Sequence, residues 1–238
     1  MSRTWGFLKL VGISNAQHPW LVRAQHLRRR IFRIDERLKE DYFGATSEPK
    51  LQIGGGWHQL EGWLNTDLEL VPGVMTLDAT RLFPFADESF QFIFTEHMIE
   101  HVSCEAGARM LRECHRVLRR GGVIRVTTPD LGAIVGLANE NLSHIQRQYL
   151  SWFCSTFVPK TRASQSAALI NAHFRLWGHE FIYDEETLAN ALYAAGFSSV
   201  KRWRLCESDH EALQDLENTQ RYPDGLLDFE SMALEARK

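Results

Sequence analysis

The sequence lacks any long hydrophobic run. No stretch approaches the roughly 20 apolar residues that a membrane-spanning helix needs. Its first residues make a poor signal peptide, because Trp5 and Lys9 interrupt a short apolar segment. The 238 residues carry a net charge of only −3, which gives no overall attraction to nucleic acid. We therefore expect a cytoplasmic protein with no transmembrane segment and no DNA partner.

Cysteine is also scarce, and its spacing is uninformative for metal binding. The four cysteines are scattered, and no two of them form a C-x-x-C pair. This argues against a disulfide framework and against a cysteine-ligated zinc site. Reduced thiols are expected, and no metal is predicted.

The sequence lacks the complete glycine fingerprint of a dinucleotide-binding loop. Gly54, Gly55 and Gly56 follow a short apolar strand, but the last glycine of the G-x-G-x-x-G pattern is absent. Asp67 comes 13 residues after Gly54, whereas the ribose-binding acid of a dinucleotide fold comes about 20 residues on. Little helix fits after Gly56 to bind a phosphate. A ligand with a ribose and no phosphate, such as S-adenosylmethionine, suits this segment better.

Short apolar segments alternate with helical patterns through the rest of the chain. Helices are predicted over residues 105–118 and 185–195, which end in glycines. This alternation is typical of an α/β Rossmann-like fold, with a seven-stranded, mostly parallel sheet, helices on both faces and an antiparallel last strand. The predicted strands are residues 51–53, 63–66, 74–77, 90–95, 123–127, 200–206 and 232–236.

Two helical additions are expected outside this sheet. Residues 1–48 form a basic segment in which apolar residues from Trp20 to Tyr42 recur every three or four positions, which predicts one amphipathic helix. It is expected to pack on the domain, although a lid, a dimer contact or a peripheral membrane contact is also open. The remaining domain, residues 49–238, is predicted to carry an aromatic-rich helical insertion at about 131–176, above the pocket.

Several of these segments together resemble the class I S-adenosylmethionine-dependent methyltransferases, in particular the methyltransferase type 11 group. The glycine motif is similar at residues 53–56, the adenine-side motif at 78–90, and the entry to the fifth strand at 116–123. The "EH" after the fourth strand is similar at Glu96 and His97. The resemblance implies S-adenosyl-L-methionine as cofactor, bound by Ile53, Gly54, Gly55, Gly56, Asp67, Leu68, Asp78, Ala79, Glu96 and His97.

One departure concerns the end of the first strand, where Gln52 replaces the acid usual in this family. The loop leading into residues 62–67 resembles a bacterial subgroup associated with surface-glycan synthesis. We therefore expect O-methylation of a small-molecule or sugar acceptor. A non-catalytic module that binds the cofactor and acts through a protein partner is the alternative, and the oligomeric state is open.

Methyl transfer needs an aligned nucleophile, and an alcohol nucleophile gains from a base. Histidine is suited to this role near neutral pH. His101 is the first candidate and His179 the second, while His97 and His173 lie in the same two regions. Asp130 could orient one of these imidazoles or cap the next helix.

His97, Glu100 and His101 also match the H-x-x-E-H pattern of some zinc peptidases. That pattern requires a helical setting and a third ligand. The zinc peptidase interpretation is therefore disfavoured.

Overall fold

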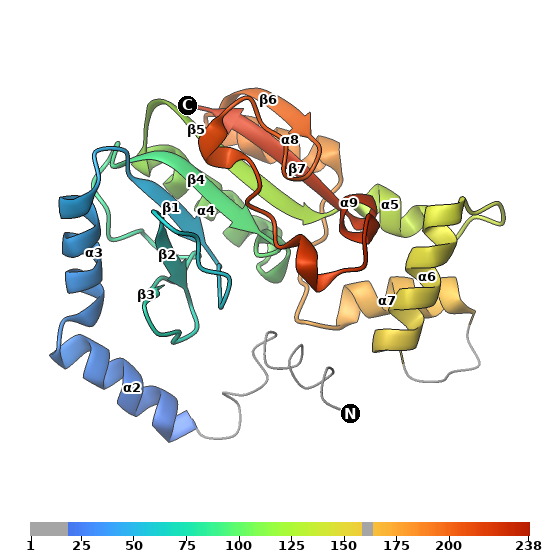
Figure 1. Cartoon of the computed structure of the whole chain (residues 1–238), viewed down its shortest axis with the longest axis horizontal. Coiled ribbons are helices and arrows are strands. Elements are labelled where there is room, and N and C mark those ends of the chain that lie inside the picture. The colour runs from blue at the N-terminus through green and yellow to red at the C-terminus, as the bar shows by residue number, and fades with distance from the viewer. Residues whose placement is uncertain (1–18, 159–163) are drawn as a thin grey trace.

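The computed structural model describes residues 19–158 and 164–238. Its centre is a seven-stranded sheet in the order β3-β2-β1-β4-β5-β7-β6, in which only β7 runs antiparallel to its neighbours (Figure 1). The predicted fold class is confirmed, including the antiparallel last strand. The strands are β1 (Lys50–Ile53), β2 (Leu64–Asp67), β3 (Met75–Thr76), β4 (Phe90–Glu96), β5 (Leu118–Pro129), β6 (Ser198–Trp203) and β7 (Ser231–Arg237).

The strand order reverses between β1 and β4. From β1 the chain first adds β2 and β3 on one side, and then adds β4 and β5 on the other. Ile53 pairs with Thr66 of β2 and with Thr95 of β4, so the carboxyl ends of these three strands lie together. Ligands of open α/β sheets bind at such a switch point.

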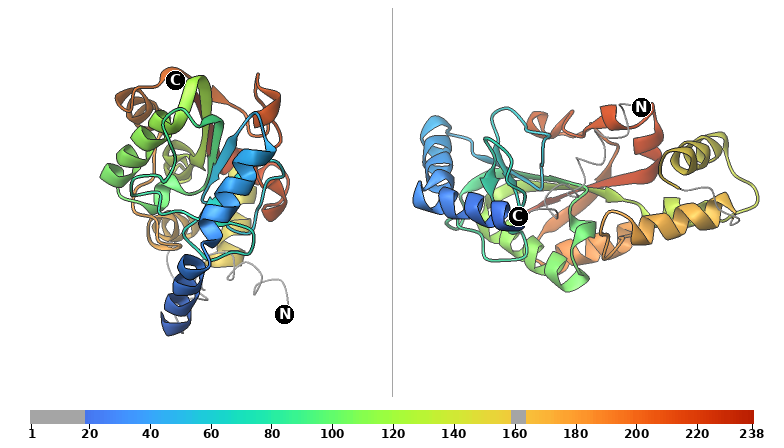
Figure 2. Two further views of the ribbon diagram at one scale, coloured as in Figure 1. Left: turned by 90° about the vertical axis from the view of Figure 1, so that its left-hand side faces the viewer. Right: turned by 90° about the horizontal axis from the view of Figure 1, so that it is seen from below.

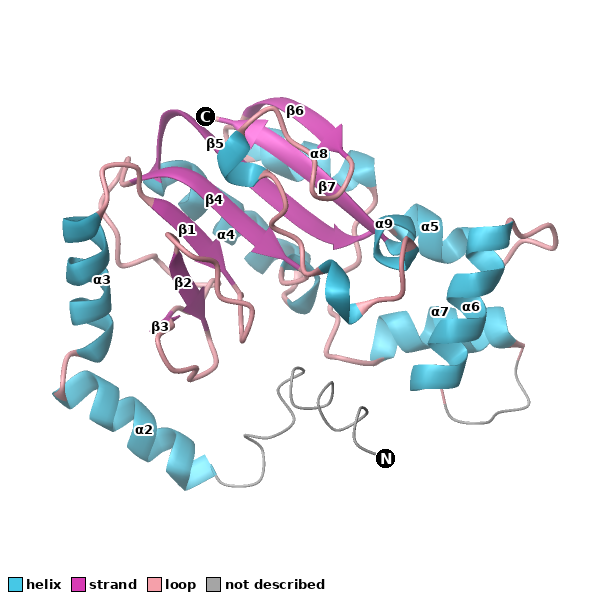
Figure 3. Cartoon of the chain, in the orientation of Figure 1, coloured by secondary structure: helices cyan, strands magenta, loops and turns pink. Residues whose placement is uncertain are grey.

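The two faces of the sheet are covered differently. Helices α4 (Cys104–Val117) and α8 (Glu185–Ala194) lie on one face (Figure 2). Residues 204–222, which we name the strap, cross the other face in front of β4 and β5 (Figure 3). The strap contains the 3-10 turns η3 (Glu211–Leu213) and η4 (Thr219–Arg221), and Leu213 and Leu216 pack there against Trp63 and Phe94.

A second apolar core lies beyond the carboxyl ends of β4 and β5 (Figure 1). We name its helices the cap: α5 (Leu131–Gly136), α6 (His144–Phe157), α7 (Gln165–Arg175) and α9 (Leu226–Glu230). Asp130 caps α5 through Gly132 N and Ala133 N, which fixes the cap directly behind β5. The 3-10 turn η2 (Ile99–His101) follows β4 at the same end.

The prediction of one N-terminal helix from Trp20 to Tyr42 was wrong. The structure has α2 (Pro19–Ile31) and α3 (Ile34–Ala45), which are separated by a left-handed Arg33 at φ 48°. The corner is fixed because Asp35 accepts hydrogen bonds from Arg29 and from Thr76 N of β3.

Only the second half of the predicted apolar stripe is covered. Leu38 and Tyr42 of α3 pack against the main core, whereas Leu27 and Ile31 of α2 are 59% and 65% exposed. Residues 1–18 of the predicted basic segment lie outside the described residues. No helix in the described part of the chain is long and apolar enough to cross a membrane.

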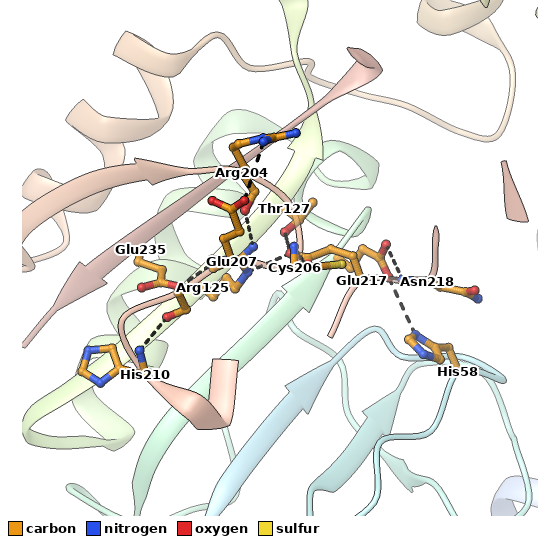
Figure 4. A network of polar contacts seen from close by, with 12 residues as sticks. His58, Arg125, Thr127, Arg204, Cys206, Glu207, His210, Glu217, Asn218 and Glu235 are labelled. Carbon is orange, nitrogen blue, oxygen red and sulfur yellow. Dashed lines mark hydrogen bonds and ion pairs between the residues drawn. The ribbon is translucent and has the colours of Figure 1, made fainter. Parts of the chain in front are cut away.

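A buried ion network joins the strap to the sheet (Figure 4). Arg125 of β5 is completely buried and donates to Glu217 of the strap and to Glu235 of β7, at 2.7 Å in each case. Thr127 also donates to Glu217, and Glu217 accepts a hydrogen bond from Cys206 N. Glu217 therefore ties the strap to β5 and to Cys206 at the start of the strap, through charge-assisted hydrogen bonds.

Candidate active site

A cavity of about 480 Å³ opens at the carboxyl ends of β1, β2 and β4. Its walls come from the glycine loop, from the strap and from the cap. All ten residues predicted to bind the cofactor line it, and so do His101 and His179. The structure therefore brings every predicted site residue to one cavity, while their individual roles stay predictions.

The glycine loop turns directly onto Asp67. Gly54 and Gly56 have φ values of 71° and 53°, which a side chain would disfavour. Asp67 accepts a hydrogen bond from Gly56 N at 2.7 Å through one carboxylate oxygen, and from Glu69 N at 2.7 Å through the other. A Cβ on Gly56 would stand 3.8 Å from the Asp67 carboxylate. That distance is an ordinary contact, so the positive φ rather than a lack of room favours glycine at this position.

Gln52 ends in a buried oxygen with no partner. Its amide nitrogen donates to the carbonyl of His58 at 2.9 Å, while Oε1 is buried beside Gly55 without a partner. An unpaired buried acceptor is costly unless a ligand supplies a donor. Gln52 Oε1 is therefore suited to accept an N–H from the cofactor's ammonium, in place of the acid usual at this position.

Asp78 lies at the opposite end of the cavity from the cap. Its carboxylate accepts hydrogen bonds from the backbone and the hydroxyl of Thr80, and Arg81 lies 2.9 Å away. The Thr80 hydrogen bonds, with Arg81, hold the pKa of Asp78 below its ordinary value. Asp78 is thus ionised and fixed beside Ala79.

The lining of the cavity is strongly acidic. Apart from histidines, Arg221 is the basic side chain among its described lining residues. S-adenosylmethionine carries a sulfonium and an ammonium against one carboxylate, so an acidic cavity favours it. The acidic lining residues are Asp67, Glu69, Asp78, Glu96, Glu100 and Glu230.

Glu96 connects the glycine side of the cavity to the strap. It accepts hydrogen bonds from Asn218 N at 3.1 Å and from Arg221 at 2.8 Å, and His58 Nδ1 lies 3.8 Å from it. Burial opposes ionisation of Glu96, but His58 and the Arg221 guanidinium outweigh burial, and its pKa falls below the ordinary value. The predicted cofactor residue thus also anchors the strap.

His101 and His179 meet at the cap end of the cavity. Their ring centroids are 4.8 Å apart in an edge-to-face arrangement. His179 Nδ1 lies 2.6 Å from the carbonyl oxygen of His173, so this nitrogen carries the proton and Nε2 carries the lone pair. Burial holds the pKa of His179 below its ordinary value. His179 is therefore a neutral imidazole with a free acceptor nitrogen.

Glu100 lies beneath these two imidazoles and is fully buried. Thr128 donates to its Oε2 at 3.0 Å, whereas Oε1 has no aligned donor. His97 Nδ1 stands 3.2 Å from that oxygen without the alignment of a hydrogen bond. Burial opposes ionisation of Glu100, but His97 and the two imidazoles above lower its pKa to about 2. Glu100 is therefore an anion inside the protein.

The other candidates of the sequence analysis have structural contacts. His173 is buried in the cap and hydrogen-bonds the hydroxyl of Tyr149. His97 bridges Glu100 and Ser231 of β7. Asp130 caps α5 and pairs with Arg202, so of its two predicted roles the capping role is the one observed.

Sequence reasoning missed the residues that the strap and the cap bring to the cavity. Asn218 and Arg221 come from a polar stretch without periodicity, and Tyr222 and Glu230 precede the last strand. Trp177 also lines the cavity. No local motif marks these positions. Only the match of His97, Glu100 and His101 to a ligand pattern singled out Glu100.

Comparison with known proteins supports the same assignment. Residues 61–126 match a family model described as a methyltransferase domain. The chain thus carries a methyltransferase domain over these residues, within the fold of the S-adenosylmethionine-dependent methyltransferases. The predicted family, enzyme class and methyl donor are thereby confirmed. No curated protein sequence matches this methyltransferase.

Solved structures share the fold of the methyltransferase at low sequence identity. An S-adenosylmethionine-dependent methyltransferase from Archaeoglobus fulgidus is 19% identical, with a TM-score of 0.50 over 90% of this chain and 99% of that chain. A possible histamine N-methyltransferase from Thermotoga maritima is 18% identical, with a TM-score of 0.45 over 93% of this chain and 100% of that one.

The residues present fit this cofactor. The orphaned oxygen of Gln52 offers an acceptor for the ammonium, and the carboxylate of Asp67 offers acceptors for the ribose. When bound, S-adenosylmethionine supplies a methyl group on a positively charged sulfur. The protein's part is to hold the acceptor in line with that methyl and to promote loss of its proton.

Proposed function

We propose that this methyltransferase O-methylates a hydroxyl of a small molecule or sugar, with His101 and His179 contacting the acceptor oxygen. The observation that carries the proposal is the tautomer of His179. Its Nδ1 donates to the His173 carbonyl, which leaves the lone pair on Nε2 of a side chain that lines the cavity. A neutral imidazole with a free nitrogen accepts a hydroxyl proton or hydrogen bond, which activates an alcohol for attack.

A sugar or similar hydroxylated ring suits the walls around this pair. The aromatic side chains of Phe157, Trp177 and Tyr222 line the cavity close to carboxylates and imidazoles. Apolar walls with a few convergent polar groups are usual for small-molecule sites. We place glycan biosynthesis within this proposal. A cytoplasmic location also belongs to it, since all four cysteines are free, as in a reducing compartment.

The test is a screen for S-adenosylhomocysteine formation with sugars, other alcohols and amines as acceptors, followed by His179→Asn. Asparagine can keep the donor to the His173 carbonyl while removing the Nε2 lone pair. With a hydroxyl acceptor we expect kcat to fall about 10²- to 10⁴-fold, as when a catalytic base is lost.

The matched control is His144→Asn, because His144 is exposed on α6 outside this cavity. It should keep the wild-type rate. Turnover of amines alone, or an unchanged rate in His179→Asn, would overturn the proposal.

A further inference from the structure

Three donor side chains converge at the cap end of the cavity. One ligand atom from each of Glu100, His101 and His179 lies within 4.8 Å of the others. Glu100 and His101 come from the turn after β4, and His179 comes from the segment before α8. Glu100 and His101 are neighbours in sequence, and the third donor of the set, His179, comes from far along the chain.

Within the described part of the chain, Glu100 is a fully buried carboxyl group that faces only imidazoles as possible cations. Its carboxylate has no lysine or arginine ion pair among the described residues, and Oε1 has no aligned donor. Removing a carboxylate from water costs several kcal/mol unless an opposite charge and hydrogen bonds compensate. A bound cation would compensate this charge and would use the orphaned oxygen.

The surroundings hold these donors as ligands are usually held. The Nδ1–H of His179 is fixed on a backbone carbonyl, which directs Nε2 outward. Thr128 fixes the other oxygen of Glu100, and His97 stands behind it, itself 2.9 Å from Ser231. Partners of this kind orient metal-binding side chains and set their tautomers.

We propose that Glu100, His101 and His179 bind one divalent transition-metal ion, of the class of Zn²⁺, Mn²⁺ or Co²⁺, whose open positions take the acceptor hydroxyl. Two imidazoles and one carboxylate suit ions of this class. Ligand atoms about 2.1 Å from a tetrahedral ion stand about 3.4 Å apart, so a pair of donors at the 4.8 Å limit of this set would close by roughly 1.4 Å on binding.

This inference rests on the proposed O-methylation and replaces proton transfer to His179 with ionisation of the hydroxyl at the ion. The acceptor oxygen binds the ion, which lowers the pKa of the hydroxyl, and its proton leaves to water. The oxygen then donates an electron pair to form the C–O bond to the methyl group. The electron pair of the broken C–S bond stays on sulfur, which becomes a neutral thioether. His101 and His179 promote proton loss through the ion rather than by taking the proton themselves.

The experiment measures metal binding by the full chain without cofactor or acceptor. The purified protein is freed of metal with a chelator and titrated with Co²⁺, followed by its visible d–d absorption, and with Zn²⁺ and Mn²⁺ by calorimetry. We expect one ion per chain and at least a hundredfold weaker binding in Glu100→Gln and in His179→Asn. Glu180→Gln, next to His179 but exposed, is the matched control and should bind like the wild type.

The outcomes separate this inference from the proposed function. Absence of stoichiometric binding, or equal binding in the two ligand variants, would overturn the metal site. Full-rate hydroxyl methylation by the metal-free protein would overturn it as well and would leave the two imidazoles as direct proton acceptors. Metal binding as expected, without methylation of any hydroxyl, would support the site and overturn the O-methylation proposal.

Discussion

The two ends of the cavity are built in different ways. The proposed cofactor end is built mainly from one stretch, from Gln52 through the glycine loop to Asp67 and Asp78, with Glu96 and His97 added from the end of β4. The proposed acceptor end uses single side chains from the turn after β4, the segment before α8, the strap and the end of α9. The first end is therefore local in sequence and the second depends on tertiary structure.

The difference implies that the two ends tolerate change differently. At the cofactor end, affinity for the ligand is expected to depend on a few neighbouring positions, such as the glycines with positive φ. An acceptor site assembled from distant segments is disturbed by anything that moves the strap, including residues that never touch the ligand. Variants that damage one end and leave the other intact sharpen this comparison.

The largest effect is expected at the buried ion network behind the strap. Arg125→Met leaves Glu217 and Glu235 buried without their cation, which should reduce the free energy of unfolding by about 3–5 kcal/mol. Urea unfolding measures the loss, and in molecules that stay folded methyl transfer should fall more than cofactor affinity.

Arg120→Met is the control for this variant, because that side chain is 92% exposed. If Arg125→Met proves too unstable to study, Glu217→Gln weakens the same network and leaves the charge of Arg125 paired with Glu235. A loss below about 1 kcal/mol in Arg125→Met, in the range of surface ion pairs, would show that the network does not hold the strap.

At the cofactor end, Asp67→Ala should abolish measurable binding of S-adenosylmethionine. Two hydrogen bonds from ribose to a carboxylate contribute about 1.5–3 kcal/mol each, so affinity should fall at least a hundredfold. Calorimetric titration measures the dissociation constant. Asp209→Ala serves as control, since that carboxylate lies on the strap and is 76% exposed. Unchanged affinity in Asp67→Ala would contradict the prediction that Asp67 binds the ribose of the cofactor.

The smallest effect concerns Glu96, where the two ends meet. Its folded-state pKa lies below the ordinary 4.5, so its ionisation stabilises the fold above that value and this contribution is lost as the pH falls through the folded pKa. The urea midpoints of wild type and Glu96→Gln should therefore differ at pH 7 and converge in acid. A difference in urea midpoint that grows on acidification would contradict a stabilising contribution from the ion pair between Glu96 and Arg221.

The sequence predicted the sheet and the cofactor end because both depend on local patterns. Short apolar strands, the glycines and Asp67 follow one another along the chain, and each strand end marks a position on the same edge of the sheet. The predicted cofactor residues accordingly line one cavity. Their contacts with the cofactor stay predictions.

The rest could not be predicted, because it depends on contacts between distant segments. Asp35 breaks the predicted N-terminal helix by accepting hydrogen bonds from Arg29 and from β3, which no helical periodicity reports. Arg221 reaches Glu96 only once the strap has crossed the sheet. The pairing of His101 with His179 likewise needs the segment before α8 to fold back onto the turn after β4.

The position of β7 has a consequence for the order in which the molecule assembles. β7 inserts between β5 and β6, and the pairing of residues 123–129 with 231–237 joins segments far apart in the chain. Contacts of such long sequence separation form late, since loop closure must come first. The proposed cofactor end is lined by residues at the ends of β1 to β4, whereas Glu230 at the other end directly precedes β7. The strand ends of the proposed cofactor site can therefore assemble before the pairing of β7 fixes the last residue of the cavity.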